Sequence, residues 1–250
     1  MTLNHKANIK ILFALTLVHF TGDFYSSFIS PLYPLFIAKM GLSLAQVGII
    51  SGLGLFLSFI VQPTVGYLAD RYSTRIFILL GVFMPVLFIP LSGLAGGFWL
   101  LLIFVALGSF GSSMFHPSVT GMVPLYSGDK VGFAMSIFNA GGTLAFGVGP
   151  LFITWYAGTF GLNAMPFIII FGLGVLWYLY LIVPVPQSEG LRRLGFFGSV
   201  RESLGPVWKS VVCIWMVMVL RAVIGQSFNT FIPVLFVRKG HSILSAGLII

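Results

Sequence analysis

The sequence predicts an all-α protein that crosses a membrane several times. Of its 250 residues, 58% are hydrophobic and only 7% are charged, whereas a soluble domain carries about 25% charged residues. The mean hydropathy is +1.07. Seven apolar runs approach or exceed the roughly 20 residues that a helix needs to cross the hydrocarbon layer. Because a segment in lipid must satisfy its own backbone hydrogen bonds, each run is expected to be a helix.

The runs follow one another with polar loops between them. Their predicted bounds are 11–37, 44–68, 76–94, 98–122, 132–156, 164–183 and 211–237. The first six would form one bundle over residues 1–185. A loop over 186–208 would lead to an incomplete second bundle over 209–250. This loop mixes leucine and phenylalanine with basic residues, which is typical of a short helix on the membrane surface, and a basic linker is the alternative.

The formal net charge of +8 reflects membrane orientation rather than nucleic-acid binding, because nearly all basic residues lie in the loops. Nine of them fall on one side of the predicted spans and three on the other. This asymmetry predicts a protein of the cell (inner) membrane with its N-terminus in the cytoplasm. The single cysteine, Cys213, excludes an intrachain disulfide.

An internal repeat relates the two predicted bundles. Residues 34–50 recur 199 positions later at 233–249, with a proline, a basic residue, glycines and a serine at matching places. A parallel repeat after six spans is typical of a two-half transporter. The second copy stops about eight residues into an eighth span. We therefore expect a fragment that lacks about 150 residues of a twelve-span protein.

The text GYLADRYSTR at residues 66–75 resembles the signature loop of the major facilitator superfamily, with Gly66, Asp70, Arg71 and Arg75 in register. The resemblance implies a six-helix N-terminal bundle plus the start of a C-terminal bundle. It also implies that this loop acts as an inner gate latch against the other half.

Within that superfamily, the chain resembles the fosmidomycin resistance transporters. The likeness covers most of residues 11–155 and includes HFTGDFYSSFISPLYPLF, GSSMFHPSVTGMV and SIFNAGGTLAFGVGPL. It implies export of a drug-like molecule. Gly149 and Pro150 also match the Gly-Pro motif of fifth spans in antiporters of the superfamily, and we expect them to serve helix packing.

Asp23 is the main candidate for chemistry, because a carboxylate halfway through an apolar span is costly unless it faces a protein interior or a water-filled cavity. His19 lies one helical turn earlier and shares its face. His116 precedes Pro117, whose ring is expected to kink the fourth span. We expect Asp23 to bind a proton that His19 could share, and we expect His116 to face the cavity at the kink and take part in proton coupling. A structural anchor and two packing histidines are the alternative.

Arg221 is the other charged residue at mid-membrane depth. Since the repeat relates the first and seventh spans, we expect Arg221 to face Asp23. Protonation of Asp23 would then release Arg221 to bind an anionic substrate. A static salt bridge is the alternative. Phe24 and Gln226 are further candidates for substrate contact.

The sequence thus predicts a secondary transporter that exports a small amphiphilic drug-like molecule in exchange for protons. Proton-coupled symport of a nutrient or organic anion, or a non-transporting fragment, are the alternatives. The sequence has no Walker-type nucleotide loop, enzyme signature, metal site or cofactor motif. A retinal protein is opposed by the lack of a lysine between Lys209 and Lys239. Expected partners are the lipid bilayer, protons, a small-molecule substrate and the missing C-terminal half, and not nucleic acid.

Overall fold

The computed structural model describes residues 6–69, 74–185, 198 and 205–250. Seven of its helical segments are long and apolar enough to cross a membrane. They confirm the predicted spans, whose bounds are met within a few residues. The segments are Ile9–Met40, Leu44–Ala69, Thr74–Leu94, Phe98–Tyr126, Val131–Phe160, Leu162–Ile182 and Gly205–Arg238. Apart from residues 198 and 205–208, the predicted inter-bundle loop lies outside the described part of the chain.

The first span is divided into two helices, α1 (Ile9–Ser26) and α2 (Ile29–Met40), with a turn at residues 27–28. Pro31 explains the position of this break. It has no N–H to donate to the carbonyl of Ser27, and its ring crowds that carbonyl. The turn leaves Asp23 in the last helical turn of α1, close to the end of the helix.

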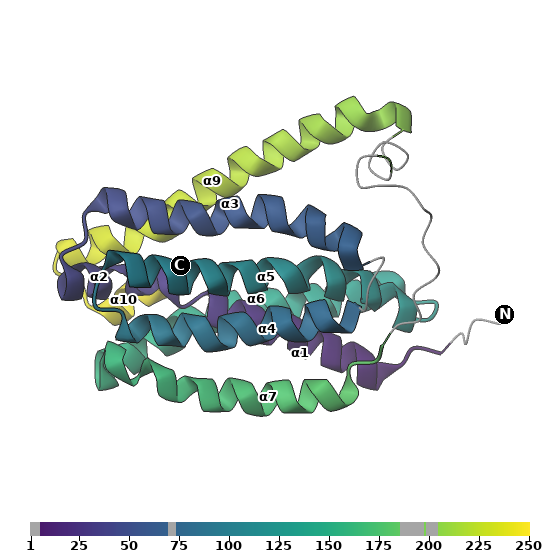
Figure 1. Ribbon diagram of the computed structural model, residues 1–250, viewed down its shortest axis with the longest axis horizontal. Helices are drawn as coiled ribbons and strands as arrows, with labels where there is room; N and C mark the ends of the chain where they lie inside the picture. The colour runs from purple at the N-terminus through teal and green to yellow at the C-terminus, as the bar shows by residue number, and fades with distance from the viewer. Residues whose placement is uncertain (1–5, 70–73, 186–197, 199–204) are drawn as a thin grey trace.

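Five further helices complete a bundle with α1. They are α3 (Leu44–Ala69), α4 (Thr74–Leu91), α5 (Phe98–Tyr126), α6 (Val131–Phe160) and α7 (Ile168–Ile182), with short 3₁₀ segments η1 (Ser92–Leu94) and η2 (Leu162–Phe167) beside them. α1 packs against α4, α5, α6 and α7, while α5 packs against α3 and α4 (Figure 1). This central position of α1 explains why its polar residues are buried.

The C-terminal part begins with η3 (Gly205–Val207) and continues with α9 (Trp208–Arg238) and α10 (Ile243–Leu248). The last turns of α9 pack against α2 and α3, where Thr230 and Val234 are buried. The first half of α9 is exposed, and it diverges from α3 toward its Trp208 end (Figure 1). α10 packs against α6. Among the described residues, the closest packing between the two halves therefore lies at the end of the bundle where α2, α3 and α6 meet α9 and α10.

The sequence repeat has a structural counterpart in the turns that follow α2 and α9. Gly41 and Gly240 occupy matching positions with φ of 66° and 87°, a region that strongly favours glycine. Two residues later, the hydroxyls of Ser43 and Ser242 each accept the backbone N–H three residues on, at 3.2 Å in both copies. The turns after α2 and after α9 therefore end one helix with a glycine and begin the next with a serine cap in the same way.

Candidate functional site

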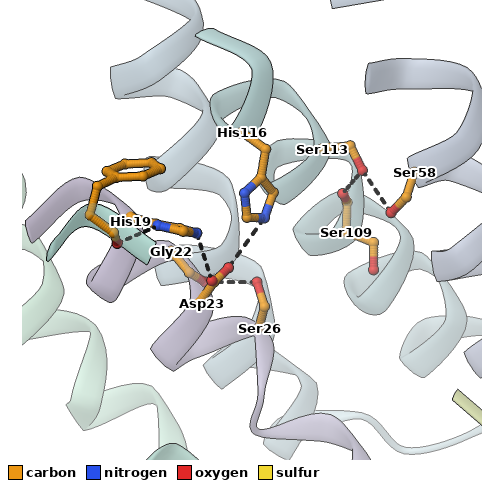
Figure 2. A network of polar contacts seen from close by, with 9 residues as sticks. His19, Gly22, Asp23, Ser26, Ser58, Ser109, Ser113 and His116 are labelled. Carbon is orange, nitrogen blue, oxygen red and sulfur yellow. Dashed lines mark hydrogen bonds and ion pairs between the residues drawn. The ribbon is translucent and has the colours of Figure 1, made fainter. Parts of the chain in front are cut away.

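Asp23 forms the centre of a buried polar cluster with two histidines. Its side chain is only 3% exposed. His19 Nε2 lies 3.1 Å from one carboxylate oxygen, Oδ2, and His116 Nε2 lies 3.2 Å from the other, Oδ1. His19 comes from α1 itself, one turn earlier, and His116 reaches across from α5 (Figure 2). The structure therefore brings together the three residues that the sequence suggested for proton binding, and we call them the triad.

Aromatic rings hold both imidazoles in place. The His19 ring stacks on Phe138 of α6, with 4.2 Å between ring centroids and 22° between planes. The His116 ring lies against Phe115, also at 4.2 Å. The two imidazoles meet edge to face at 5.3 Å. Each histidine faces Asp23 with its Nε2.

A backbone hydrogen bond fixes which nitrogen of His19 carries hydrogen. Nδ1 lies 3.0 Å from the carbonyl oxygen of Phe138, and a carbonyl can only accept, so Nδ1 donates. In the neutral ring, Nε2 then presents a lone pair to Asp23 Oδ2. The arrangement is favourable when a proton lies between these two atoms.

The triad also has the spacing of a metal site. One nitrogen or oxygen atom from each of its three residues could bind a metal ion, and these atoms lie within 4.8 Å of one another.

Gly142 of α6 provides the space that the triad needs. A Cβ at this position would stand 2.6 Å from His19 Nε2 and 2.8 Å from Asp23 Oδ2. No side chain fits there without displacing one of them. The sequence signal for this position is the glycine pair at residues 141–142, because adjacent small residues in a span indicate close helix approach.

A cavity of about 240 Å³ adjoins the triad and is lined by Asp23 and His116. Serine, glutamine and asparagine side chains from α1, α3, α5 and α9 form much of the rest of its wall. No lysine or arginine from the described ranges lines it. His19 is set behind Asp23 and does not line the cavity. The triad therefore meets the cavity through Asp23 and His116.

Gln226 lies in this cavity wall. Its amide nitrogen donates to Ser51 Oγ at 2.9 Å, and Ser51 and Thr230 hydroxyls lie 2.6 Å apart. Thr230 Oγ1 in turn donates to the backbone carbonyl of Gln226 at 2.7 Å. These three residues form a closed ring of hydrogen bonds that joins α3 to α9. Ser51 and Thr230 are polar residues within apolar spans, but the sequence alone does not predict that their hydroxyls meet.

Comparison with known proteins identifies the family of the chain. The sequence profile described as Major Facilitator Superfamily matches residues 14–250. The chain belongs to the major facilitator superfamily. The fosmidomycin resistance protein of Escherichia coli (strain K12) is 31% identical over 150 residues, which cover 60% of this chain and 37% of that protein. The uncharacterized MFS-type transporter YfnC of Bacillus subtilis (strain 168) is 28% identical over 174 residues, covering 68% and 42%. The matches thus span less than half the length of each relative.

Solved transporters share the fold of this superfamily member. A bacterial homologue of the human lysosomal transporter Spinster, in an inward-facing and occupied conformation, aligns with a TM-score of 0.71 and 20% identity. The alignment covers 95% of this chain and 56% of that one. A peptide transporter in complex with sulfate aligns with a TM-score of 0.55 and 21% identity, covering 84% and 46%. These likenesses show that the chain shares the helical fold of these transporters.

Arg221 does not meet Asp23, so the predicted pair is wrong for this structure. Arg221 is exposed on the diverging half of α9, and Asp23 contacts the two histidines instead. The repeat relates positions along the two spans, but it does not fix the tilt of α9. Phe24 is likewise absent from the cavity wall. Its ring packs against Phe152 of α6, with centroids 5.3 Å apart.

The superfamily's signature loop is only partly described, since Asp70 and Arg71 lie outside the described residues. Gly66 lies in the last turns of α3, with Pro117 at ordinary contact distance from a would-be Cβ, 3.8 Å. Arg75 at the start of α4 donates to the carbonyl of Tyr180 in α7 and lies over its ring, 4.8 Å from the centroid. In this structure Arg75 therefore ties two helices of one bundle together rather than joining the two bundles.

The Gly-Pro pair of α6 lies at two helix contacts. A Cβ on Gly149 would stand 3.0 Å from the backbone carbonyl of Phe24, so α1 and α6 approach closely there. The carbonyl of Pro150 would stand 2.8 Å from a Cβ on Gly247, so α10 approaches the same stretch. The pair thus packs α6 against both halves of the protein.

Proposed function

We propose that this chain forms part of a proton-coupled secondary transporter of the inner membrane, which moves a small molecule by alternating access to the cavity. The observation that carries the proposal is the buried Asp23 carboxylate between two histidines, one of which lines the cavity. Carboxylates within membrane spans are costly and mark ion or proton pathways. The distribution of basic residues over the loops supports a cytoplasmic N-terminus.

In this proposal the coupling proton lies between Asp23 and His19. The fixed Nδ1–H of His19 leaves its second nitrogen facing Asp23 Oδ2 at 3.1 Å. Two atoms that each present a lone pair repel one another at that distance. A single proton between them makes a charge-assisted hydrogen bond instead. Proton binding therefore stabilises the packed triad, and proton release loosens the contact between α1 and its neighbours.

His116 forms the path between this proton and the cavity. Its side chain is 29% exposed, whereas that of Asp23 is 3% exposed. An imidazole can accept a proton on one nitrogen and donate one from the other. A proton from cavity water thus reaches Asp23 Oδ1 through His116, the more exposed of the two side chains.

Export in exchange for protons is the proposed direction. The Escherichia coli relative is named for fosmidomycin resistance, which supports export of a drug-like molecule. Symport of an organic anion through Arg221 has less support, because Arg221 is exposed on α9 and does not line the cavity. The two directions respond oppositely to an imposed proton gradient.

The test is flux in proteoliposomes, using the protein with any sequence that follows Ile250 in its gene. Asp23→Asn removes the charge and leaves the shape, so proton-driven export should stop while exchange of substrate for substrate continues. His241→Ala is the matched control, because this histidine is exposed and lies far from the triad along the chain. Proton-driven export that persists in Asp23→Asn would refute the coupling role. A requirement for the opposite gradient would establish symport.

A further inference from the structure

The ring of hydrogen bonds between Ser51, Gln226 and Thr230 lies between the two halves of the protein. Ser51 belongs to α3 of the first half, and the other two residues belong to α9 of the second. Thr230 is 1% exposed and Ser51 is 8% exposed, so the hydroxyls of both are withdrawn from solvent. Ser51 and Gln226 also line the cavity. The ring is therefore both a contact between the halves and a part of the cavity wall.

Each hydroxyl of the ring both donates and accepts a hydrogen bond. Thr230 Oγ1 donates its single hydrogen to the backbone carbonyl of Gln226 at 2.7 Å. Because Thr230 has no second hydrogen, Ser51 Oγ must donate in the 2.6 Å contact between the two hydroxyls. Ser51 then accepts from the Gln226 amide at 2.9 Å. Separation of α3 from α9 would break the last two hydrogen bonds together, so the ring favours the closed arrangement.

The ring lies near one end of the spans. Ser51 is in the first turns of α3, and Thr230 is in the last turns of α9. Toward Trp208, α9 diverges from α3 and is exposed (Figure 1), and the rings of Phe59 and Trp215 meet edge to face with 6.2 Å between centroids. Such an apolar contact between helices costs little to lose in lipid, whose tails are equally apolar. The ring is therefore the more selective of these two contacts between α3 and α9.

We infer that the ring is the outer gate of the cavity, and that Ser51 and Thr230 are positioning residues that hold this gate shut. The inference rests on the proposed function, because it takes alternating access and a cytoplasmic N-terminus as given. It goes beyond that proposal by assigning the closed side to neutral hydroxyl and amide groups. Among the described residues, the ring shares no hydrogen bond with the triad. Loss of one hydroxyl should therefore open the outer side and leave the proton site intact.

The experiment measures how fast a cysteine in the cavity reacts with a membrane-impermeant maleimide. The reporter is Ser30→Cys, at a position that lines the cavity, in a Cys213→Ser background of the protein with any sequence that follows Ile250 in its gene. Right-side-out membrane vesicles expose the outer face to the reagent, and inverted vesicles expose the inner face. Thr230→Val replaces the hydroxyl by a methyl group and leaves the Ser51 hydroxyl without its acceptor. It should raise labelling from outside about tenfold, with no rise from inside.

Two matched variants separate gate opening from general loosening. Thr230→Ser keeps the hydroxyl and loses only a methyl group, so labelling should stay within about twofold of the parent protein. Ser58→Ala removes a cavity hydroxyl whose partners, Gly54 and Ser113, both belong to the first half, so it should also leave labelling unchanged. His241→Cys marks the outer side, because this exposed position follows α9 and should react only in right-side-out vesicles.

The inference is overturned if Thr230→Val leaves outside labelling unchanged, or raises it no more than Ser58→Ala or Thr230→Ser does. Labelling that rises from both sides would show a loosened fold and would also overturn it. So would a His241→Cys protein that reacts only in inverted vesicles. Proton coupling is measured separately, through the flux of Asp23→Asn. If Thr230→Val opens the outer side but Asp23→Asn still exports with protons, the gate stands and the coupling fails. If Asp23→Asn stops export but Thr230→Val does not change labelling, the coupling stands and the gate fails.

Discussion

Replacement of Gly142 by alanine tests the triad most directly without removing any of its members. The new Cβ would stand 2.6 Å from His19 Nε2, 0.8 Å closer than the 3.4 Å at which ordinary van der Waals contact begins. His19 is held on both sides, by the Phe138 carbonyl at 3.0 Å and by Asp23 at 3.1 Å. A retreat of the ring must therefore lengthen at least one of these two contacts.

The expected cost follows from these distances. Overpacking a well-packed site costs about 1–3 kcal/mol, and a hydrogen bond to a charged group contributes about 1.5–3 kcal/mol. We expect Gly142→Ala to reduce the free energy of unfolding by about 1–3 kcal/mol. A loss of about 1.4 kcal/mol at the His19–Asp23 contact weakens proton binding about tenfold. The proton concentration for half-maximal flux then rises by the same factor, so the pH of half-maximal flux falls by about one unit.

The assay is proton-driven flux in proteoliposomes over a range of pH, with thermal melting in detergent as the measure of folding. Gly147→Ala is the matched control on the same helix, because a Cβ there would meet no atom within 4 Å. The control should match the wild-type protein in melting temperature and pH profile. A Gly142→Ala protein that melts and transports like the control would show that the tight fit around the triad is irrelevant to coupling.

Two further predictions concern other contacts. Tyr25→Phe removes a buried hydroxyl that donates to the carbonyl of Ile168 at 2.7 Å, so the free energy of unfolding should fall by about 1 kcal/mol with unchanged flux; an unchanged melting temperature would contradict the bond. Ser51→Cys combined with Thr230→Cys, in a Cys213→Ser background, should cross-link on oxidation because the two hydroxyls lie 2.6 Å apart. Flux should stop on oxidation and return on reduction, and cysteines that fail to cross-link would place α3 and α9 further apart.

The spans were predictable because hydropathy acts locally, one helix at a time. The His19–Asp23 contact was predictable for the same reason, since a spacing of four residues on a helix fixes both direction and distance. The contact of His116 with Asp23 was not, because it depends on how α5 crosses α1. Residue type and an adjacent proline could suggest that His116 faces inward, but not which group it meets.

The predicted Asp23–Arg221 pair is wrong for the same reason, because the contact depends on how two helices lie relative to each other. Internal symmetry fixes position along a span, whereas a contact also depends on the tilt of α9, which diverges from α3 over its first half. The role of Gly142 was hidden for a different reason. A glycine has no side chain to suggest a function, so only the distance from its missing Cβ to His19 reveals what it excludes.

The turn at residues 27–28 divides the first span into two bodies with different neighbours. α1 carries Asp23 and is fixed among α4, α5, α6 and α7, while α2 packs against α9. Because Pro31 interrupts the helical hydrogen bonding between them, the joint transmits force less stiffly than an unbroken helix. We therefore expect the two halves to tilt against each other through α2 while the contacts around Asp23 stay in place. In the first span, α1 would be the fixed part and α2 the moving part.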